Sequence, residues 1–273
     1  MPARTLGGIG RSSQSAIPVL RAAQCDVAIG SHITYSRASA GTRYNSAGLL
    51  ATMASGVPRI DYDPVSLAVR GLLIEEQRSN LLTYSEQFDN AAWVSGFATV
   101  TANSEVSPAG TTSADKLAET SDNGFHFLYQ ATTVGGGASL CLSAFAKAAG
   151  RDWAILEAYD GVAYPNAYVN LTTGALGAVT SGVATIETAG AGMRRCSIRY
   201  TMAAGTASRV YLLTALGNLM PTFAGDVTKG LAAWGGMLEA ATTDYPHATS
   251  YIPTVAAQAT RAADDATITG DAF

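Results

Sequence analysis

Arg194-Arg195-Cys196-Ser197-Ile198-Arg199-Tyr200-Thr201-Met202 is the stretch whose pattern decides the fold class. In its centre, Cys196, Ile198 and Tyr200 alternate with serine and arginine. Successive side chains of a β-strand point to opposite faces of a sheet. This period of two therefore predicts a strand with one apolar and one polar face.

Further strand-like segments recur from Leu81 onward at modest spacing. They are Ala98 to Ala102, Ala114 to Glu119, Phe125 to Thr132, Ser139 to Lys147, Trp153 to Tyr159, Ala167 to Leu171, Val183 to Glu187, Arg209 to Thr214, Leu231 to Leu238 and Ser250 to Pro253. Thr172-Thr173-Gly174 has the composition of a hairpin turn between two of them. Many short strands separated by turn signals predict an all-β fold, a jelly-roll β-sandwich of about ten strands.

The composition agrees with this fold class. Charged residues make up 14% of the chain, well below the usual quarter, and small residues dominate its second half. Small residues suit closely packed sheets and close contact between subunits. The net charge of −4 gives no reason to expect nucleic acid binding. No stretch has the length of a signal peptide's apolar region or of a membrane span, so we expect a soluble protein without membrane insertion.

Four segments are expected along the chain. Residues 1–30 are rich in Gly, Ser and Arg without periodicity, and they predict an extended N-terminal arm that docks on another surface or remains a flexible tail. Residues 31–80 hold short β-like pieces, among them an apolar run at Gly71–Glu75, and are expected to wrap on the sandwich. The sandwich is expected at residues 81–268 and a C-terminal tail at residues 269–273.

The distribution of charge separates the first part of the chain from the rest. Up to Asn80 the chain carries eight Arg, no Lys and five acidic residues, whereas the remainder has a balance of −7. Arg4, Arg11 and Arg21 are candidates for docking to a neighbouring particle protein through forked hydrogen bonds. Ordinary surface arginines are the alternative interpretation.

The three cysteines, Cys25, Cys141 and Cys196, show no C-x-x-C spacing, so neither a zinc site nor a disulfide framework is indicated. Cys141 and Cys196 lie inside strand-like runs and are expected to be buried free thiols. Free thiols fit a protein that is assembled in a reducing cytoplasm.

Several motifs in a fixed order make up a more specific pattern, over residues 33 to 268. They are Tyr35-Ser36-Arg37-Ala38-Ser39, Pro58-Arg59-Ile60-Asp61-Tyr62-Asp63-Pro64, the run from Gly71 to Trp93, Thr111 to Leu117, Arg194-Arg195-Cys196, Trp234 to Glu239, Thr249 to Thr254 and Thr260-Arg261-Ala262-Ala263-Asp264. Together they resemble the carbohydrate-binding-type jelly-roll domain of bacteriophage, or gene-transfer-agent-like, head spike and tail fibre proteins.

The resemblance implies a jelly roll carried on a virion and exposed on its surface after assembly in the bacterial cytoplasm. It implies attachment to host surface polysaccharide, other virion proteins as partners (capsid, spike base or tail) and a homo-oligomer. Members of this family often continue into further domains after the Thr-Arg-Ala-Ala-Asp element, whereas this sequence ends at Phe273. That departure also allows the role of a spike base or connector.

Aromatic side chains near amides and carboxylates are the groups that bind sugars. The best such cluster spreads over two predicted strands and their loop, and consists of Trp153, Tyr159, Asp160, Tyr164, Asn166 and Tyr168. Tyr159 and Tyr164 flank the loop and are the better candidates within it. A second candidate is Phe125, His126, Phe127 and Tyr129. The alternative for both is that these aromatics fill the core, as Trp93 and Trp234 are expected to do.

No catalytic constellation is recognised in the sequence. The histidines have no metal-ligand partner at the helical spacing, and a carboxylate pair such as Glu157 and Asp160 is expected by chance in a chain with this many acids. Related jelly rolls often hold a structural calcium, and Asp89 and Glu239 stand at matching places; the alternative is that Asp89 caps a turn before Trp93. No other cofactor is expected.

These observations favour a non-enzymatic spike or fibre subunit that binds host polysaccharide. A structural connector or capsid decoration protein without direct glycan binding is the first alternative. A polysaccharide depolymerase is the second, and the absence of a recognised catalytic constellation counts against it.

Overall fold

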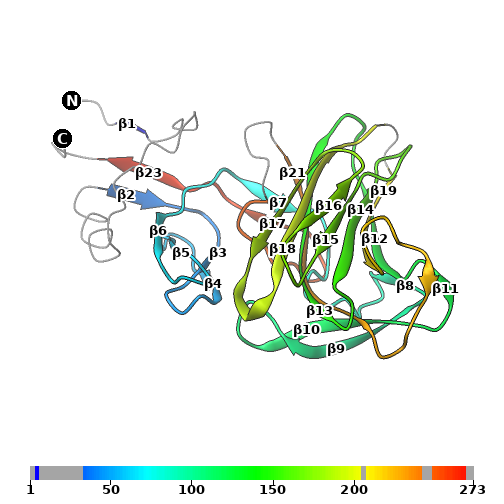
Figure 1. The fold of residues 1–273 in the computed structure, drawn as a ribbon. Helices are drawn as coiled ribbons and strands as arrows, with labels where there is room; N and C mark the ends of the chain where they lie inside the picture. The colour runs from blue at the N-terminus through cyan, green and yellow to red at the C-terminus, as the bar shows by residue number, and fades with distance from the viewer. Residues whose placement is uncertain (1–3, 6–32, 204–206, 242–247, 269–273) are drawn as a thin grey trace. The chain divides into compact units, whose positions relative to one another are not determined.

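The computed structural model describes residues 4–5, 33–203, 207–241 and 248–268 (Figure 1). The chain forms two compact units. The first consists of residues 1–78, 249–252 and 260–273, and the second of residues 79–248 and 253–259. The one helical segment among the described residues is the three-residue 3₁₀ turn η1 (Gly190–Gly192). None of the described residues belongs to a helix with the length and apolar character of a membrane span.

The second unit contains two six-stranded sheets, and every strand pair in them is antiparallel. We call them the first and the second sheet. The first sheet has the order β17 (Val183–Thr188), β18 (Arg194–Thr201), β13 (Ser139–Ala149), β21 (Gly230–Ala240), β10 (Thr112–Glu119), β9 (Ala98–Val106). The second sheet has the order β16 (Leu176–Val179), β15 (Asn166–Asn170), β14 (Trp153–Tyr159), β19 (Ala207–Ala215), β12 (Phe127–Thr133), β8 (Val94–Gly96). β11 (Asn123–Gly124) and β20 (Phe223–Ala224) form a separate two-stranded sheet in the same unit.

The chain passes repeatedly from one sheet to the other, which makes the unit a jelly-roll sandwich and confirms the expected fold class. β12 belongs to the second sheet, β13 returns to the first, and β14 to β16 form the second sheet again. In Figure 1, β9 and β10 run along the lower edge of the sandwich and β8 lies toward its right-hand end.

One hydrophobic core lies between the two sheets, and both contribute alternate residues to it. From β18 the core receives Cys196, Ile198 and Tyr200, as the alternation in the sequence predicts. From the second sheet it receives Leu128, Ala154, Leu156, Ala158, Ala167, Val169, Val210 and Leu212. Burying one large aliphatic side chain contributes about 2 kcal/mol, so the sandwich rests mainly on this layer. Trp93 and Trp234 are buried, as expected.

The connection between β15 and β16 is the predicted hairpin turn. Gly174 donates its N–H to the carbonyl of Asn170 at 2.8 Å and has a φ of 78°, a left-handed conformation that favours glycine. The Asn170 side chain accepts the N–H of Thr173 at 2.8 Å and closes the turn.

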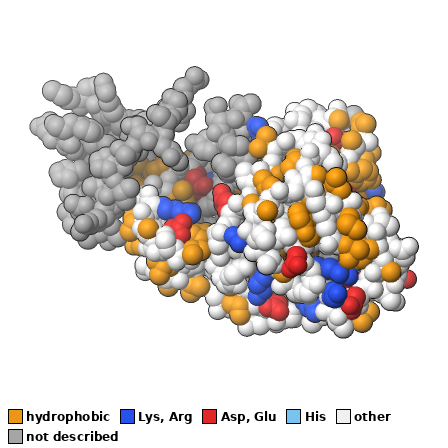
Figure 2. Space-filling model, viewed as in Figure 1, with side chains coloured by type: hydrophobic (Ala, Val, Ile, Leu, Met, Phe, Trp, Pro, Cys, Tyr) orange, Lys and Arg blue, Asp and Glu red, His pale blue; other side chains and the backbone are white. Residues whose placement is uncertain are grey.

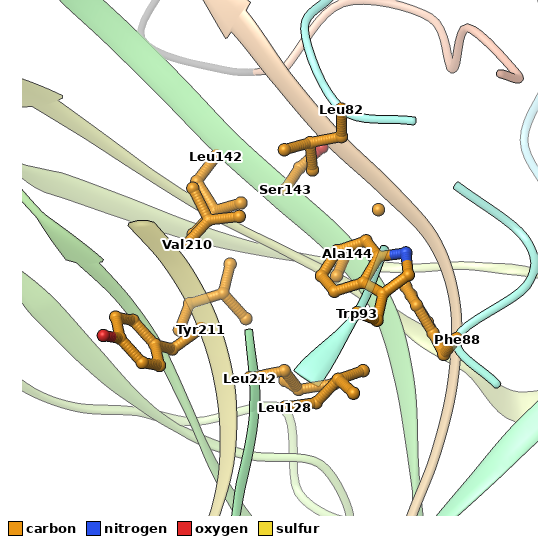
Figure 3. Close-up of a pocket in the computed structure, with 12 residues that line it drawn as sticks. Leu82, Phe88, Trp93, Leu128, Leu142, Ser143, Ala144, Val210, Tyr211 and Leu212 are labelled. Carbon is orange, nitrogen blue, oxygen red and sulfur yellow. The ribbon is translucent and has the colours of Figure 1, made fainter. Parts of the chain in front are cut away.

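A small cavity remains within the core at the end nearest Trp93 (Figure 3). Its volume is about 20 Å³, and its walls include Leu82, Phe88, Leu128 and Leu142. This is room for about one water molecule, whereas pockets for small molecules measure about 300 Å³ or more. The cavity is a packing gap that has no room for a small molecule of that size.

The first unit is built from short strands. β1 (Arg4–Thr5), β23 (Asp265–Ile268) and β2 (Ile33–Ser36) form a three-stranded sheet. β3 (Gly41–Tyr44) pairs with β4 (Leu50–Met53), and β5 (Ile60–Tyr62) pairs with β6 (Val69–Leu72). The chain passes between the two units within β7 (Arg78–Asn80) and within β22 (Ala259–Arg261).

Buried charges hold this unit together where an apolar core would be expected. Arg59 and Arg261 have almost no exposed surface, and both lie beside the carboxylates of Glu75 and Asp264. Arg59 also donates to the carbonyl of Thr42 at 3.0 Å. Glu75 and Asp264 come from segments far apart in the sequence, so the charges join the two ends of the unit.

The division of the chain differs from the expected one. Residues 249–252 and 260–268 belong to the first unit because β23 pairs with β2 and Asp264 lies among the buried arginines. Ser250–Pro253 is not a strand, and the run at Gly71–Glu75 leaves its strand after Leu72. The predicted arm, residues 1–30, lies outside the described residues except for β1.

Candidate functional site

The outer face of the second sheet carries the side chains that alternate with its core residues. On β14, Ala154, Leu156 and Ala158 point into the core, so Glu157 and Tyr159 lie on the opposite face. The same alternation on β19 and β12 places residues of both strands on this face. β19 lies between β14 and β12, which makes the three strands one continuous surface.

Five aromatic rings on this face form what we call the aromatic row: Phe127, Tyr129, Tyr159, Tyr164 and Tyr211. Ring centroids are 5.0 Å apart for Tyr159 and Tyr164, 6.2 Å for Tyr164 and Tyr211, and 5.3 Å for Tyr211 and Tyr129. Phe127 lies 5.8 Å from Tyr211. Figure 3 shows the Tyr211 ring pointing away from the core cavity.

The rings of the aromatic row are partly open to solvent. Tyr164 is 47% exposed, and the four others are half-buried. Aromatic rings that pack against one another at their edges and keep one face open can receive an apolar ligand face. Figure 2 shows charged side chains gathered toward the lower edge of the sandwich, where Figure 1 places β9 and β10, and mostly uncharged side chains above it.

Arg209 is the cation of this face. Its register on β19 places it directly opposite Tyr159 on one side and Ala131 on the other. The guanidinium carbon lies 5.8 Å from the centroid of the Tyr129 ring, and the neighbouring Tyr211 raises the pKa of Arg209. Burial raises the pKa of Tyr211, so this tyrosine stays a neutral partner of the arginine.

Glu157 and Asn166 add hydrogen-bonding groups beside the aromatic row. They stand opposite each other on β14 and β15, and the Asn166 amide donates to Glu157 Oε2 at 3.2 Å. Burial raises the pKa of Glu157 above its usual value. The amide oxygen of Asn166 is buried and has no partner within the described part of the chain. It is therefore an acceptor that a ligand hydroxyl can satisfy.

The residues of the first predicted cluster have three different roles in the structure. Tyr159, Tyr164 and Asn166 lie on the open face, as described above. Asp160 instead stabilises the turn between β14 and β15, because its Oδ1 accepts the N–H groups of Val162 at 2.9 Å and Ala163 at 2.6 Å. The expectation that Asp160 contacts a ligand is not supported, since the turn uses this oxygen.

Trp153 and Tyr168 serve packing. Tyr168 is buried in a small cluster with Ile155, Leu213 and Ala215, and Trp153 packs against that cluster. The loop after β19 closes over this end of the face, where Asn218 accepts the N–H of Ala178 at 2.7 Å. For these two aromatics the core-like alternative is the one that the structure favours.

The second predicted cluster divides in the same way. Phe127 and Tyr129 belong to the aromatic row, whereas Phe125 is exposed apart from it. His126 is buried, and its ring nitrogens lie 2.6 Å and 3.1 Å from the carbonyl oxygens of Phe97 and Phe223. The two candidate clusters are thus parts of one surface, and β19 supplies Tyr211 and Arg209 between them. Alternation along β19 was the available signal for these two residues.

Asp89 and Glu239 do not form one metal site. Asp89 is exposed and follows Phe88, whose N–H bonds Asp115 at 2.7 Å. Asp115 pairs with Ala233 of β21, and Glu239 lies six positions further along that strand, roughly 20 Å away. Both carboxylate oxygens of Asp115 accept backbone N–H groups, one of them that of Asn103 at 2.8 Å. Within the described ranges no three His, Cys, Asp or Glu side chains are grouped to hold a metal.

The predicted docking arginines cannot be placed. Arg11 and Arg21 lie outside the described residues, and only the backbone of Arg4 is described, as part of β1. Cys141 and Cys196 are buried free thiols, as expected.

Comparison with known proteins finds similar solved structures at low sequence identity. No family model matches the chain, and no curated protein matches it. Among solved structures, it is similar to TmCBM61 in complex with β-1,4-galactotriose at 12% identity, with a TM-score of 0.39 over 59% of this chain and 99% of that one. The carbohydrate-binding module TmCBM27, described for mannan recognition, is 13% identical, with a TM-score of 0.31 over 62% and 98%.

A third similar structure is the enzymatically active domain of tailspike protein 4 of bacteriophage CBA120. The identity is 14% and the TM-score 0.34, over 58% of this chain. The match spans only 21% of the tailspike chain.

Proposed function

We propose that the sandwich binds saccharide, without catalysis, through the outer face of its second sheet. The observation that carries this proposal is the aromatic row with Glu157 and Asn166 beside it. The C–H faces of sugar rings pack on aromatic rings, and side-chain amides and carboxylates satisfy sugar hydroxyls. The rings and Glu157 lie on one side of one sheet, with Asn166 opposite Glu157 on the neighbouring strand.

The shape of the face favours a chain of sugars over a single small molecule. The aromatic row extends across β12, β19 and β14, and its rings are partly open to solvent. An open site of this kind gives weak affinity per copy, because few groups of the ligand are enclosed. Several copies in a homo-oligomer would raise the overall affinity by avidity.

The proposal extends to the biological setting. We place the protein on the surface of a phage-type particle, where it attaches the particle to host surface polysaccharide and contacts other virion proteins. The support is the series of sequence motifs that resembles phage spike and fibre proteins. Several of these motifs meet in the first unit, where Arg37, Arg59, Glu75 and Asp264 form the buried charge cluster.

A non-catalytic role agrees with the geometry of the acids on this face. Hydrolysis of a glycosidic bond needs two carboxyl groups that flank the bond. Asp160 is engaged in its turn, and Glu157 hydrogen-bonds Asn166. The face therefore offers Glu157 as a binding group.

Binding of the fluorescently labelled protein to candidate host cells tests this proposal. We expect binding that periodate treatment of the cell surface abolishes, and that Tyr164→Ala weakens. Phe125→Ala is the matched control, because Phe125 is similarly exposed but is not among the residues whose rings contact the aromatic row in the described part of the chain. Periodate-insensitive binding, or equal loss in both variants, would contradict a glycan site here. The connector role would then gain weight, and a search for a protein partner would follow.

A further inference from the structure

Arg209 is an arginine without an acidic partner among the described residues. Six other arginines each form an ion pair with a carboxylate: Arg37, Arg59, Arg70, Arg78, Arg151 and Arg261. Within the described part of the chain, no carboxylate lies within ion-pair distance of Arg209, whose side chain is exposed. Its contacts are with tyrosines of the aromatic row.

These contacts orient the guanidinium without using up its donors. The Tyr129 ring lies under it at 5.8 Å, and Tyr211 is the neighbour on the same strand that interacts with it most strongly. A guanidinium has five N–H donors in a planar fork, so most of them remain free. Such a fork matches the two oxygens of a carboxylate, and a cation stacked on aromatic rings keeps its charge available.

The charge stands at one end of the face. Tyr159 is directly opposite Arg209, and Glu157 is two positions before Tyr159 on the same strand. Neighbouring strands lie about 4.8 Å apart, so a sugar ring on Tyr159 or Tyr164 would be next to the guanidinium. Glu157, one register step away and directly opposite Tyr211, would repel a carboxylate and accept hydroxyls instead.

We propose that the saccharide bound by this face is acidic, and that Arg209 binds the carboxylate of a uronic acid or of a similarly acidic sugar. This inference rests on the proposed function of the face. Glu157 and Arg209 together give the site a direction, with the acidic sugar at Arg209 and a neutral sugar at Glu157. A polysaccharide of repeating units that contain one acidic sugar fits this arrangement.

The test measures affinity for matched acidic and neutral ligands. A panel of uronate-containing polysaccharides (polygalacturonate, alginate and hyaluronan) is titrated before and after chemical reduction of its carboxyl groups to alcohols. We expect at least one native polymer to bind at least tenfold more tightly than its reduced form, because charge-assisted hydrogen bonds are strong. High salt is expected to weaken binding of the native polymer and to leave binding of the reduced polymer nearly unchanged.

Variants assign the effect to one residue. Arg209→Gln is expected to bring the native polymer to the affinity of the reduced one, whereas Arg209→Lys retains part of the difference. Lys116→Gln is the control, because Lys116 is a cation of β10 in the other sheet and should leave the difference intact. A melting curve of each variant verifies the fold.

The outcomes separate the two proposals. Equal binding of native and reduced polymers would overturn the acidic specificity and leave saccharide binding in place. A preference that survives in Arg209→Gln would overturn the role of Arg209. Binding of neither form, together with no periodate-sensitive attachment to cells, would overturn both.

Discussion

Arg37 and Asp264 form an ion pair at 3.2 Å, and neither side chain has any exposed surface. The two residues are separated by most of the chain, yet they lie in one unit together with Arg59, Glu75 and Arg261. Tyr35 donates its hydroxyl to the same carboxylate. A small unit with few buried apolar residues is thus organised around a carboxylate that several segments share.

The first prediction concerns Asp264→Asn. Removing one partner of a buried ion pair leaves an uncompensated charge and costs about 3–5 kcal/mol. We expect the first unit to unfold locally in this variant while the sandwich remains folded. Hydrogen exchange measured on peptides from each unit checks this outcome. Asp265→Asn is the control, because Asp265 is adjacent but exposed and should leave exchange unchanged.

The second prediction concerns acid. Burial opposes ionisation of both carboxyls, but Tyr35 and Arg59 lower the pKa of Asp264 below its usual value, and Arg261, Arg59 and Ser250 do the same for the pKa of Glu75. A carboxyl with a depressed pKa stabilises the fold above its unfolded-state pKa, near 4, and this contribution is lost as the pH falls through the lower folded value. The first unit is therefore expected to open below about pH 4.

The sandwich should respond less to acid. Burial raises the pKa of Asp115 and of Glu157, so protonation of these groups does not oppose folding, and Glu119, whose pKa the hydrogen bond from Arg151 lowers, is the exception in the sandwich. Hydrogen exchange of both units between pH 3 and pH 7 tests this difference. Opening of the sandwich before the first unit would show that the buried charges are not the acid-sensitive element.

The sequence allowed the sandwich strands to be predicted because each carries its own periodicity. Trp153–Tyr159 has the predicted bounds, and Ser139–Lys147 falls within β13 (Ser139–Ala149). Alternation is a local property of a strand with one buried face, so it can be recognised without knowing the partners. The hairpin turn at Gly174 was recognisable for the same reason.

Strand order across a sheet could not be predicted in this way. Tyr211 and Arg209 belong to the site because β19 lies between β14 and β12, and a strand's neighbours are set by packing over long sequence distances. The first unit shows the same limit. Glu75 and Asp264 meet through β23 and the buried arginines, and nothing local in either segment indicates the other.

The third prediction concerns Gly230→Ala. A Cβ at Gly230 would lie 1.9 Å from the carbonyl oxygen of Leu117, so it would force β21 and β10 apart. Overpacking of this kind costs about 1–3 kcal/mol, and we expect a melting temperature several degrees lower. Gly135→Ala is the control, because a Cβ there meets nothing within 4 Å. Equal melting temperatures would contradict the close approach of the two strands.

The fourth prediction concerns the buried thiols. Burial raises the pKa of Cys141 and of Cys196 to about 12, and the thiolate is the reactive form. In a Cys25→Ser variant we expect no alkylation by iodoacetamide at pH 8 until denaturant is added, after which two thiols react. Fast labelling of the native variant would mean that one of these strands opens readily.

The fifth prediction concerns Tyr211, whose ring contacts Tyr129, Tyr164 and Phe127. Because it occupies the middle of the aromatic row, Tyr211→Ala should remove stacking surface and disturb its neighbours. An aromatic contact is worth about 0.5–1.5 kcal/mol, which corresponds to roughly a twofold to tenfold loss of affinity for a saccharide. Tyr211→Phe keeps the ring and removes only the hydroxyl, which interacts electrostatically with Arg209. Calorimetric titration should therefore show that Tyr211→Phe loses affinity for carboxylated saccharides alone. If Tyr211→Phe and Tyr211→Ala lost the same affinity for neutral saccharides, stacking on this ring would be contradicted.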